Sequence, residues 1–298
     1  MVSEVVFIAP SIIHPNSGSA LLRGEQLRQL VAPYLERHGI ATRTTQGTEF
    51  RDALLILGKN VLLATSAKAI ERLRRRGNIV CADPLDGTVP DEVLARADIL
   101  LAASKMQMRA FAPYAARQRV AYVGHHVDLR IGAVRVPDDR FRMAYFGEIF
   151  NARHFEALSD TVTFVRTDTA RADNVAWMAQ LTNFNAHYAV RARQAYDGFK
   201  PFTKGFVAAH CGCPILVDAD DAEARLFLPN DYPYFADGGS VDSVRDVIRR
   251  MAAEFRGPLW RQAEAAMHAL RATGAPEIIG RQLYDAIAPA LARIGARK

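Results

Sequence analysis

The sequence predicts an α/β fold made of two doubly wound halves. Short apolar runs alternate with amphipathic stretches along the whole chain, as they do where parallel strands are covered by helices on both faces. Each apolar run is bounded by Gly, Pro or Asp, which suits turns. A polar, basic segment at Asp128–Asp138 interrupts the alternation. We therefore expect one domain at residues 1–130 and a second at 139–275.

In the first half, the clearest helix is predicted over Gly18–His38, where leucines recur near helical spacing and Gly39 follows. A second helix is predicted over Ala67–Arg76. The apolar runs predict strands at Val5–Ala9, Asp52–Leu57, Asn60–Thr65, Asn78–Ala82, Ala97–Ala103 and Val120–Val123.

In the second half, the helix predicted over Thr203–His210 has clear boundaries, because Pro201 precedes it and Gly212 and Pro214 follow it. Further helices are predicted at Val175–Leu181, Ser240–Phe255, Leu259–Arg271 and Ile278–Ile294. Strands are predicted at Met143–Phe146, Thr161–Val165, His187–Val190 and Pro214–Val217.

The composition excludes several classes of protein. With 298 residues, 50% of them hydrophobic and 23% charged, the chain is neither disordered nor fibrous. No apolar run reaches the roughly 18 residues that a membrane-spanning helix needs. Glu4 stands where a signal peptide would carry a cation, so we expect a cytoplasmic protein. The three cysteines lack a second ligand pair at zinc-like spacing, and the adjacent His125 and His126 do not suit one site, so no bound metal is expected.

The charge balance favours anionic partners. Lys and Arg outnumber Asp and Glu by 38 to 32, a net charge of +6. Aromatic and basic residues do not alternate on any predicted strand, so no nucleic-acid partner is expected. The densest basic run, Arg72–Arg76, lies at a helix end, where cations complement the helix dipole. Three interpretations of this run stay open: a solvated helix face, peripheral contact with a membrane surface such as the inner membrane, or contact with nucleic acid.

The best candidate for an anion site lies at the start of the Thr203 helix. The phosphate loop and the Gly-x-Gly-x-x-Gly fingerprint are both absent from the sequence. Free N–H groups of the helix N-terminus would be joined there by Lys200, Thr203, Lys204 and Arg191. Four polar side chains around one strand–loop–helix unit predict a diphosphate site, with solvated lysines as the alternative.

Several segments are similar to one family. Ala208–Val217 resembles the helix–turn–strand signature of the C-terminal domain of GT-B glycosyltransferases, and Lys200–Lys204 resembles a variant in short bacterial members. Met143–Glu148 is similar to the strand and glycine that open that domain, and Gly124–Asp128 to the segment that closes the N-terminal one. His14–Gly24 is similar to the glycine-bearing loop and helix that face the interdomain cleft.

This resemblance implies two Rossmann-like domains facing a cleft, the first binding the acceptor and the second the nucleotide-sugar. It implies a final helix at 276–298 that packs back toward the first domain. The substrate would be a nucleotide-sugar, with no other cofactor, and the acceptor a glycan or lipid-linked precursor in bacterial surface polysaccharide synthesis. The residues assigned to nucleotide-sugar binding are Arg191, Lys200, Thr203, Lys204, Gly147, Glu148 and Glu223.

One departure from the family bears on activity. Retaining members of the commonest class carry two glutamates that would fall at Phe199 and Val207 here. Donor recognition must then differ, with Asp218 or Glu223 as candidate hydroxyl-accepting carboxylates, or catalysis is lost. A catalytically silent nucleotide- or glycan-binding protein of the same fold is therefore the alternative.

An inverting enzyme would also need a general base on the acceptor side. Asp83 follows the strand Asn78–Ala82, and partial burial there would make its carboxylate more basic, so we expect it to serve as the base. His14 is the second candidate. The alternative interpretation of Asp83 is a turn-forming residue before Pro84.

Overall fold

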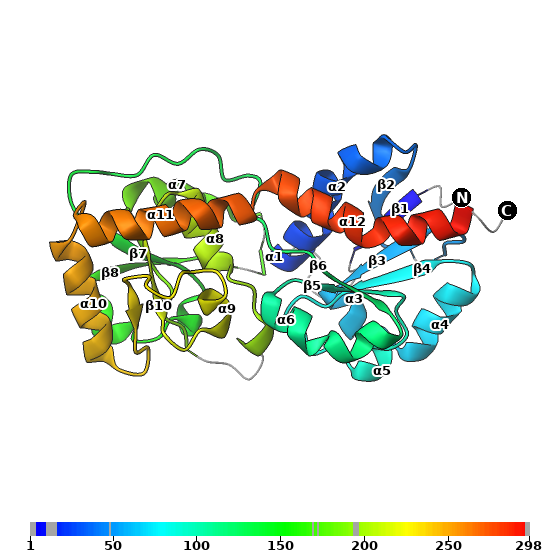
Figure 1. Cartoon of the computed structure of the whole chain (residues 1–298), viewed down its shortest axis with the longest axis horizontal. Coiled ribbons are helices and arrows are strands. Elements are labelled where there is room, and N and C mark those ends of the chain that lie inside the picture. Colours follow the sequence, from blue (N-terminus) through cyan, green and yellow to red (C-terminus); the bar gives the residue numbers. More distant parts are fainter. Residues whose placement is uncertain are drawn as a thin grey trace. The chain divides into compact units, whose positions relative to one another are not determined.

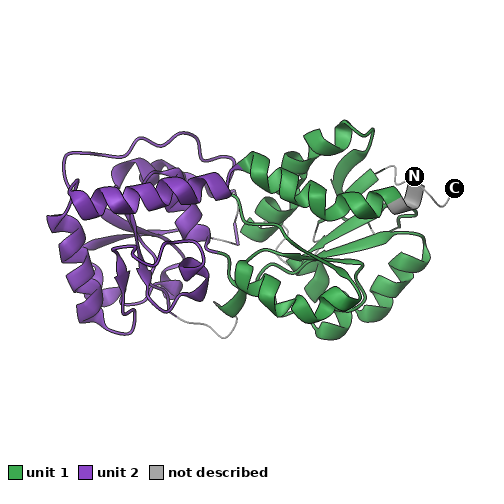
Figure 2. Cartoon of the chain, viewed as in Figure 1, with its two compact units in different colours: residues 1–126, 196–201, 276–298 green, residues 127–195, 202–275 purple. Residues whose placement is uncertain are grey.

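The computed structural model describes residues 4–9, 17–47, 49–168, 170–171, 173–192 and 197–295. The chain forms two compact units, which are coloured separately in Figure 2. Unit 1 consists of residues 1–126, 196–201 and 276–298, and unit 2 of residues 127–195 and 202–275.

Within its described residues, unit 1 contains a six-stranded parallel sheet in the order β2-β1-β3-β4-β5-β6 (Figure 1). The chain lays β2 on one side of β1 and then returns to place β3 on the other. In open α/β sheets, ligands bind outside the carboxyl ends of the strands near such a reversal. The strands are β1 (Glu4–Ile8), β2 (Ala41–Thr45), β3 (Leu54–Gly58), β4 (Ile79–Asp83), β5 (Ile99–Ala102) and β6 (Arg119–Tyr122).

Helices cover both faces of this sheet, because alternate residues of each strand point to opposite faces and both sets are apolar. The helices are α1 (Gly18–Ala20), α2 (Leu27–Glu36), α3 (Lys59–Leu63), α4 (Ala67–Arg75), α5 (Asp91–Leu94), α6 (Lys105–Ala110) and α12 (Pro276–Gly295). Between α1 and α2, Leu21–Gln26 forms a π-helical segment, a rare conformation that is common at functional sites.

The helix α12 belongs to unit 1 and packs on α2. The two helices approach so closely that a Cβ on Gly280 would lie 2.2 Å from the carbonyl oxygen of Leu30. Tyr34 and Tyr284 stack with their ring centroids 5.9 Å apart. Arg119, at the start of β6, donates a hydrogen bond of 2.6 Å to the carbonyl of Ala286. The sheet face below α2 therefore has its cover completed by a segment distant in sequence.

Unit 2 contains, in its described residues, a five-stranded parallel sheet in the order β11-β10-β9-β7-β8. Tyr145 and Tyr188 lie in the larger core, on the face covered by α10 and α11, while Phe146 and Cys213 belong to the opposite face. The strands are β7 (Met143–Gly147), β8 (Val162–Arg166), β9 (Ala186–Tyr188), β10 (Ile215–Asp218) and β11 (Phe235–Ala236). The helices are α7 (Ala176–Gln180), α8 (Thr203–His210), α9 (Ala222–Arg225), α10 (Val241–Ala253) and α11 (Pro258–Thr273).

The predicted α/β class with parallel sheets is confirmed, and α8 has the predicted bounds. The strand predicted at Asn60–Thr65 is wrong, because these residues belong mostly to α3, in which Leu62 is buried and Leu63 is 44% exposed. The strand β2 was not predicted, since its residues are polar and largely exposed. The short elements α5, α6, α9 and β11 were also not predicted.

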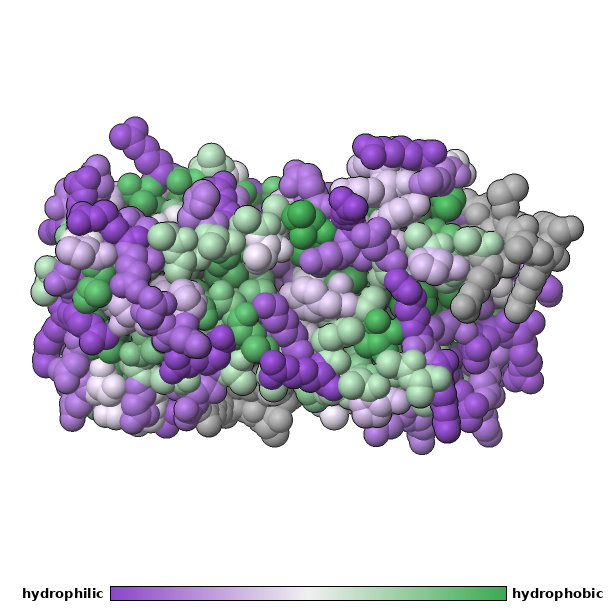
Figure 3. Space-filling model, viewed as in Figure 1, coloured by the Kyte–Doolittle hydropathy of each residue, from purple (hydrophilic) through white to green (hydrophobic). Residues whose placement is uncertain are grey.

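The surface carries polar side chains over most of the area seen in one view. On the face drawn in Figure 3, hydrophilic side chains are interspersed with smaller hydrophobic areas. Among the described residues, we find no helix with the length and apolarity needed to cross a bilayer.

Candidate functional site

The predicted nucleotide-sugar-binding residues of unit 2 lie at or after the carboxyl ends of its strands. Gly147 is the last residue of β7, and Glu148 follows it. Arg191 follows β9 after two further residues, and Thr203 and Lys204 open α8. This edge is where parallel α/β sheets bind ligands, and a helix N-terminus such as that of α8 favours negative charge.

Lys204 is held against the end of β7. Its Nζ donates a hydrogen bond to the carbonyl of Phe146 and lies 4.2 Å from the centroid of the Tyr145 ring. The hydroxyl of Tyr145 in turn donates to the carbonyl of Glu148, at 2.9 Å. A Cβ on Gly147 would lie 2.5 Å from Nζ and 2.8 Å from the Tyr145 hydroxyl oxygen, so glycine is what permits this approach. The first turn of α8 therefore places a cation at the end of β7.

Arg191 is fixed by pairing between two loops. It forms an antiparallel bridge with Ala152, and the neighbouring Ala192 N–H donates to the carbonyl of Asn151 at 3.0 Å. Burial raises the pKa of Tyr145 to about 12, and the positive charge of Arg191 opposes this rise. Burial also raises the pKa of Asp221 above its usual range, again against the charge of Arg191. The charge of Arg191 is thus close enough to lower the pKa of both Tyr145 and Asp221.

Three carboxylate side chains lie at this edge of the unit 2 sheet, those of Asp218, Glu223 and Glu148. Oδ1 of Asp218 accepts hydrogen bonds from the N–H groups of Asp220 at 3.0 Å and Gly238 at 3.3 Å, which ties the end of β10 to the turn after β11. Glu223 is buried in the first turn of α9. Glu148 lies 3.8 Å from Nε of Arg166.

Not all of the predicted site residues lie in one unit. Lys200 belongs to unit 1, where its Nζ lies 3.9 Å from Oδ2 of Asp86. Asp86 also binds Lys59, at 2.7 Å. His14 lies outside the described residues. Lys200 is thus assigned to a different unit from Thr203, Lys204 and Arg191, and its part in the same anion site stays a prediction.

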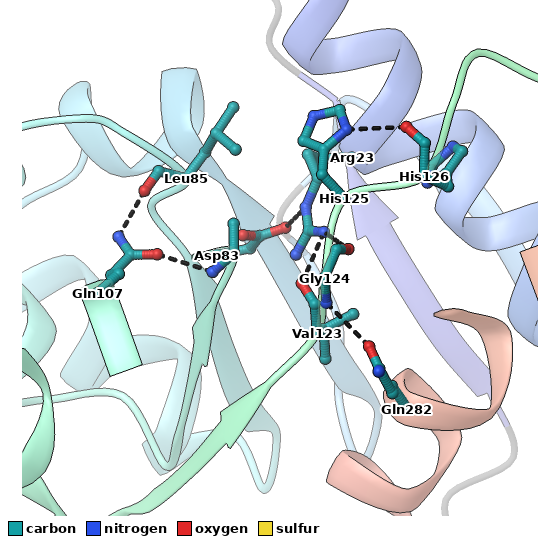
Figure 4. A network of polar contacts seen from close by, with 10 residues as sticks. Arg23, Asp83, Leu85, Gln107, Val123, Gly124, His125, His126 and Gln282 are labelled. Carbon is teal, nitrogen blue, oxygen red and sulfur yellow. Dashed lines mark hydrogen bonds and ion pairs between the residues drawn. The ribbon is translucent and has the colours of Figure 1, made fainter. Parts of the chain in front are cut away.

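A second polar cluster lies at the carboxyl ends of β4 and β6 in unit 1 (Figure 4). Nε of Arg23, in the π-helical segment, donates to Oδ2 of Asp83 at 2.8 Å, and the two side chains are 2% and 0% exposed. Nη1 donates to the carbonyls of Val123 at 3.0 Å and Gly124 at 2.7 Å. Nη2 of Arg23 and Oδ1 of Asp83 are buried and have no hydrogen-bond partner within the described chain.

His125 adjoins this ion pair. Burial, followed by the positive charge of Arg23, lowers the pKa of His125 to about 4, so the ring is neutral near pH 7. Its Nδ1 lies 2.9 Å from the carbonyl oxygen of His126. A carbonyl only accepts, so Nδ1 carries the proton and Nε2 carries the lone pair.

Sequence reasoning considered His125 only as a metal ligand and did not single out Arg23. The sequence did contain one indication, because Arg23 lies among the leucines of the predicted helix Gly18–His38. A buried arginine needs a carboxylate or carbonyl partner. The structure shows no group of three or more His, Cys, Asp or Glu side chains arranged to hold a metal ion, as far as its described residues extend.

Solved structures share this fold over nearly the whole chain. The protein is similar to Anabaena HepE, solved in complex with UDP, with a TM-score of 0.62 and 12% identity over 98% of this chain and 100% of that one. It is similar to sucrose-phosphate synthase from Thermosynechococcus elongatus, with a TM-score of 0.65 and 12% identity over 98% and 100%. The apo form of the lipopolysaccharide outer core galactosyltransferase WaaB gives a TM-score of 0.60 and 10% identity over 97% and 100%.

No protein-family model and no curated protein sequence matches the chain. The likeness at these identities is one of fold, and it confirms the expectation of two Rossmann-like units of the GT-B type.

Proposed function

We propose that this protein is a glycosyltransferase that uses a UDP-sugar. The observation that carries the proposal is the cationic edge of unit 2, where Lys204 is held at the end of β7 beside Gly147 and Arg191 follows β9. The solved structures of similar fold include HepE in complex with UDP and with UDP-glucose. A diphosphate at this edge would meet two cations and the N-terminus of α8 together.

This set of groups suits departure of a nucleotide diphosphate. The leaving group gains negative charge in the transition state, and prearranged cations and N–H groups stabilise it without a metal. Lys204, Arg191 and the hydroxyl of Thr203 are the proposed diphosphate ligands, and Glu148 and Glu223 the proposed partners of sugar or ribose hydroxyls. Lys200 stays a predicted ligand, and Asp83 and His14 stay the predicted acceptor-side bases.

The acceptor is proposed to be a glycan or a lipid-linked precursor of a bacterial surface polysaccharide. WaaB, which shares the fold, acts on the outer core of lipopolysaccharide by its description. We propose a cytoplasmic location, and the arginines at the end of α4 are the proposed contact with the inner membrane.

Calorimetric titration with UDP tests the donor site. Lys204→Met and Arg191→Met should each lose about 1.5–3 kcal/mol of binding free energy, the scale of a charge-assisted hydrogen bond, which raises Kd roughly 10- to 150-fold. Arg249→Met is the control, because Arg249 lies on α10 and pairs with Asp246 at the surface. Unchanged affinity in both site variants contradicts the assignment. A chelator should leave UDP binding unchanged if no metal takes part.

UDP release from a panel of UDP-sugars separates the enzyme from its alternative. A catalytically silent binding protein remains a candidate because Phe199 and Val207 stand where retaining relatives of this fold are expected to carry glutamates. Binding of UDP without release from any UDP-sugar would favour the silent protein.

A further inference from the structure

The segment that carries His125 is held on several sides. Arg23 donates to the two carbonyls that precede His125, those of Val123 and Gly124. The N–H of Gly124 donates to Oε1 of Gln282 in α12, at 2.9 Å. The imidazole itself donates to the carbonyl of His126 (Figure 4). These contacts fix both the position and the tautomer of the ring.

The fixed tautomer leaves one chemical function for Nε2. A neutral ring whose Nδ1 carries the proton presents a lone pair at Nε2. No described residue donates a hydrogen bond to Nε2. Nε2 is also absent from the set of fully buried polar atoms without a partner, so this nitrogen is not sealed inside the described residues. Figure 4 shows this nitrogen on the side of the ring away from the His126 carbonyl. The ring lies just beyond β6, at the ligand-binding edge of the sheet.

We propose that Nε2 of His125 accepts a hydrogen bond from a hydroxyl group of the sugar acceptor, and that Arg23 and Asp83 are positioning residues for it. The inference rests on the proposed function and names the group that unit 1 offers to the acceptor. An uncharged nitrogen that accepts a hydrogen bond suits a hydroxyl group, which donates one. A phosphate or carboxylate group would instead need a cation at this position.

Asp83 has a different role in this arrangement. Its side chain is fully buried and its Oδ2 accepts a hydrogen bond from Arg23, so in this proposal it orients the guanidinium. Arg23 in turn holds the carbonyls before His125. The base predicted from the sequence and the hydroxyl-binding residue inferred here are therefore different side chains, and experiment can separate them.

Two substitutions of His125 distinguish the ring nitrogens. Glutamine places its amide group near the position of Nε2 and can accept there, whereas asparagine reaches only the position of Nδ1. We expect His125→Gln to keep most of the acceptor-dependent rate. We expect His125→Asn to lower kcat/KM for the acceptor roughly 10- to 100-fold, as for a lost hydrogen bond. The affinity for UDP should be unchanged in both.

The measurement compares UDP release from UDP-glucose in water with release stimulated by free glucose, galactose and mannose as acceptor probes. Loss confined to the hexose-stimulated rate supports the proposal. Loss of hydrolysis alone identifies a bound water as the partner and overturns it, and weaker binding of UDP-glucose but not UDP identifies the donor sugar and also overturns it. An active asparagine variant beside an inactive glutamine variant overturns it by assigning the function to Nδ1.

Heteronuclear NMR of the imidazole nitrogens gives a reading that does not need turnover. We expect wild-type His125 to carry its proton on Nδ1, and its Nε2 resonance to shift when UDP and a hexose are added together. A proton on Nε2, or no shift with any of the hexoses, overturns the proposal. Failure of the wild-type protein to bind UDP at all would instead count against the proposed function. Arg23→Lys should disturb the tautomer while leaving UDP affinity intact, a result that a merely structural role would not give.

Discussion

The buried ion pair between Arg23 and Asp83 makes a quantitative prediction about the stability of unit 1. Removing one partner leaves the other charge buried, which costs about 3–5 kcal/mol in comparable pairs. Arg23→Met also leaves the carbonyls of Val123 and Gly124 without their donor, at about 1–3 kcal/mol for each buried unsatisfied group. Asp83→Asn keeps an acceptor for Nε and should lie near 3 kcal/mol.

The double variant Arg23→Met/Asp83→Leu isolates the pair. With both charges gone, no uncompensated ion remains, so the double variant should lose less than the sum of the single variants, with a coupling energy of about 2 kcal/mol or more. The matched control is Glu25→Gln, which breaks the partly exposed pair of Glu25 with Arg28 and should cost no more than about 1 kcal/mol.

Urea unfolding followed by two probes gives the assay. The only tryptophans of the chain, Trp177 and Trp260, belong to unit 2, so their fluorescence follows that unit, whereas circular dichroism follows both. A loss of 3–5 kcal/mol at a slope of about 2 kcal/mol per molar lowers the midpoint for unit 1 by roughly 1.5–2.5 M. Single-variant losses that add within about 0.5 kcal/mol would refute the reasoning, because they show that the two charges do not interact.

Two further predictions concern unit 1. The pKa of His125 is 6.5 in the unfolded chain and about 4 in the folded chain, because the folded protein buries the neutral ring. The stability that the neutral ring contributes is therefore fully present above pH 6.5 and is lost as the pH falls to 4, about 3 kcal/mol in all. Urea unfolding across this range should show a flatter loss for His125→Gln than for wild type, and equal slopes would contradict the assignment. Gly280→Ala places a Cβ 2.2 Å from the Leu30 carbonyl and should cost about 1–3 kcal/mol, whereas Gly24→Ala, with open space around its Cβ position, should not lower the melting temperature.

Sequence patterns predict well those helices and strands whose secondary structure is set by residues nearby in sequence. The strands of both sheets are apolar on both faces, and turn residues bound them, so most were predicted. The run Asn60–Thr65 failed because so short an apolar stretch fits a strand or one turn of helix equally well. The strand β2 was missed because it is largely exposed at the edge of the sheet, so its sequence lacks the apolar residues that identify a buried strand.

The candidate site divides in the same way. Lys204 and Arg191 could be placed at the ligand edge because that edge follows from the ends of β9 and the start of α8. The contact between Arg23 and Asp83 joins residues 60 apart in sequence, and no local pattern encodes it. The neutral state of His125 depends on burial that only the folded unit creates.

The position of α12 in unit 1 affects how the protein is made. Ile279, Leu283 and Ile287 cover apolar side chains of β1 and β3, which leave the ribosome first. Before the last described helix has been synthesised, α2 covers only part of that face of the sheet, whereas the segments of unit 2 are complete earlier. A chain without α12 therefore leaves apolar side chains of β1 and β3 exposed, and we expect it to aggregate more readily than the whole chain.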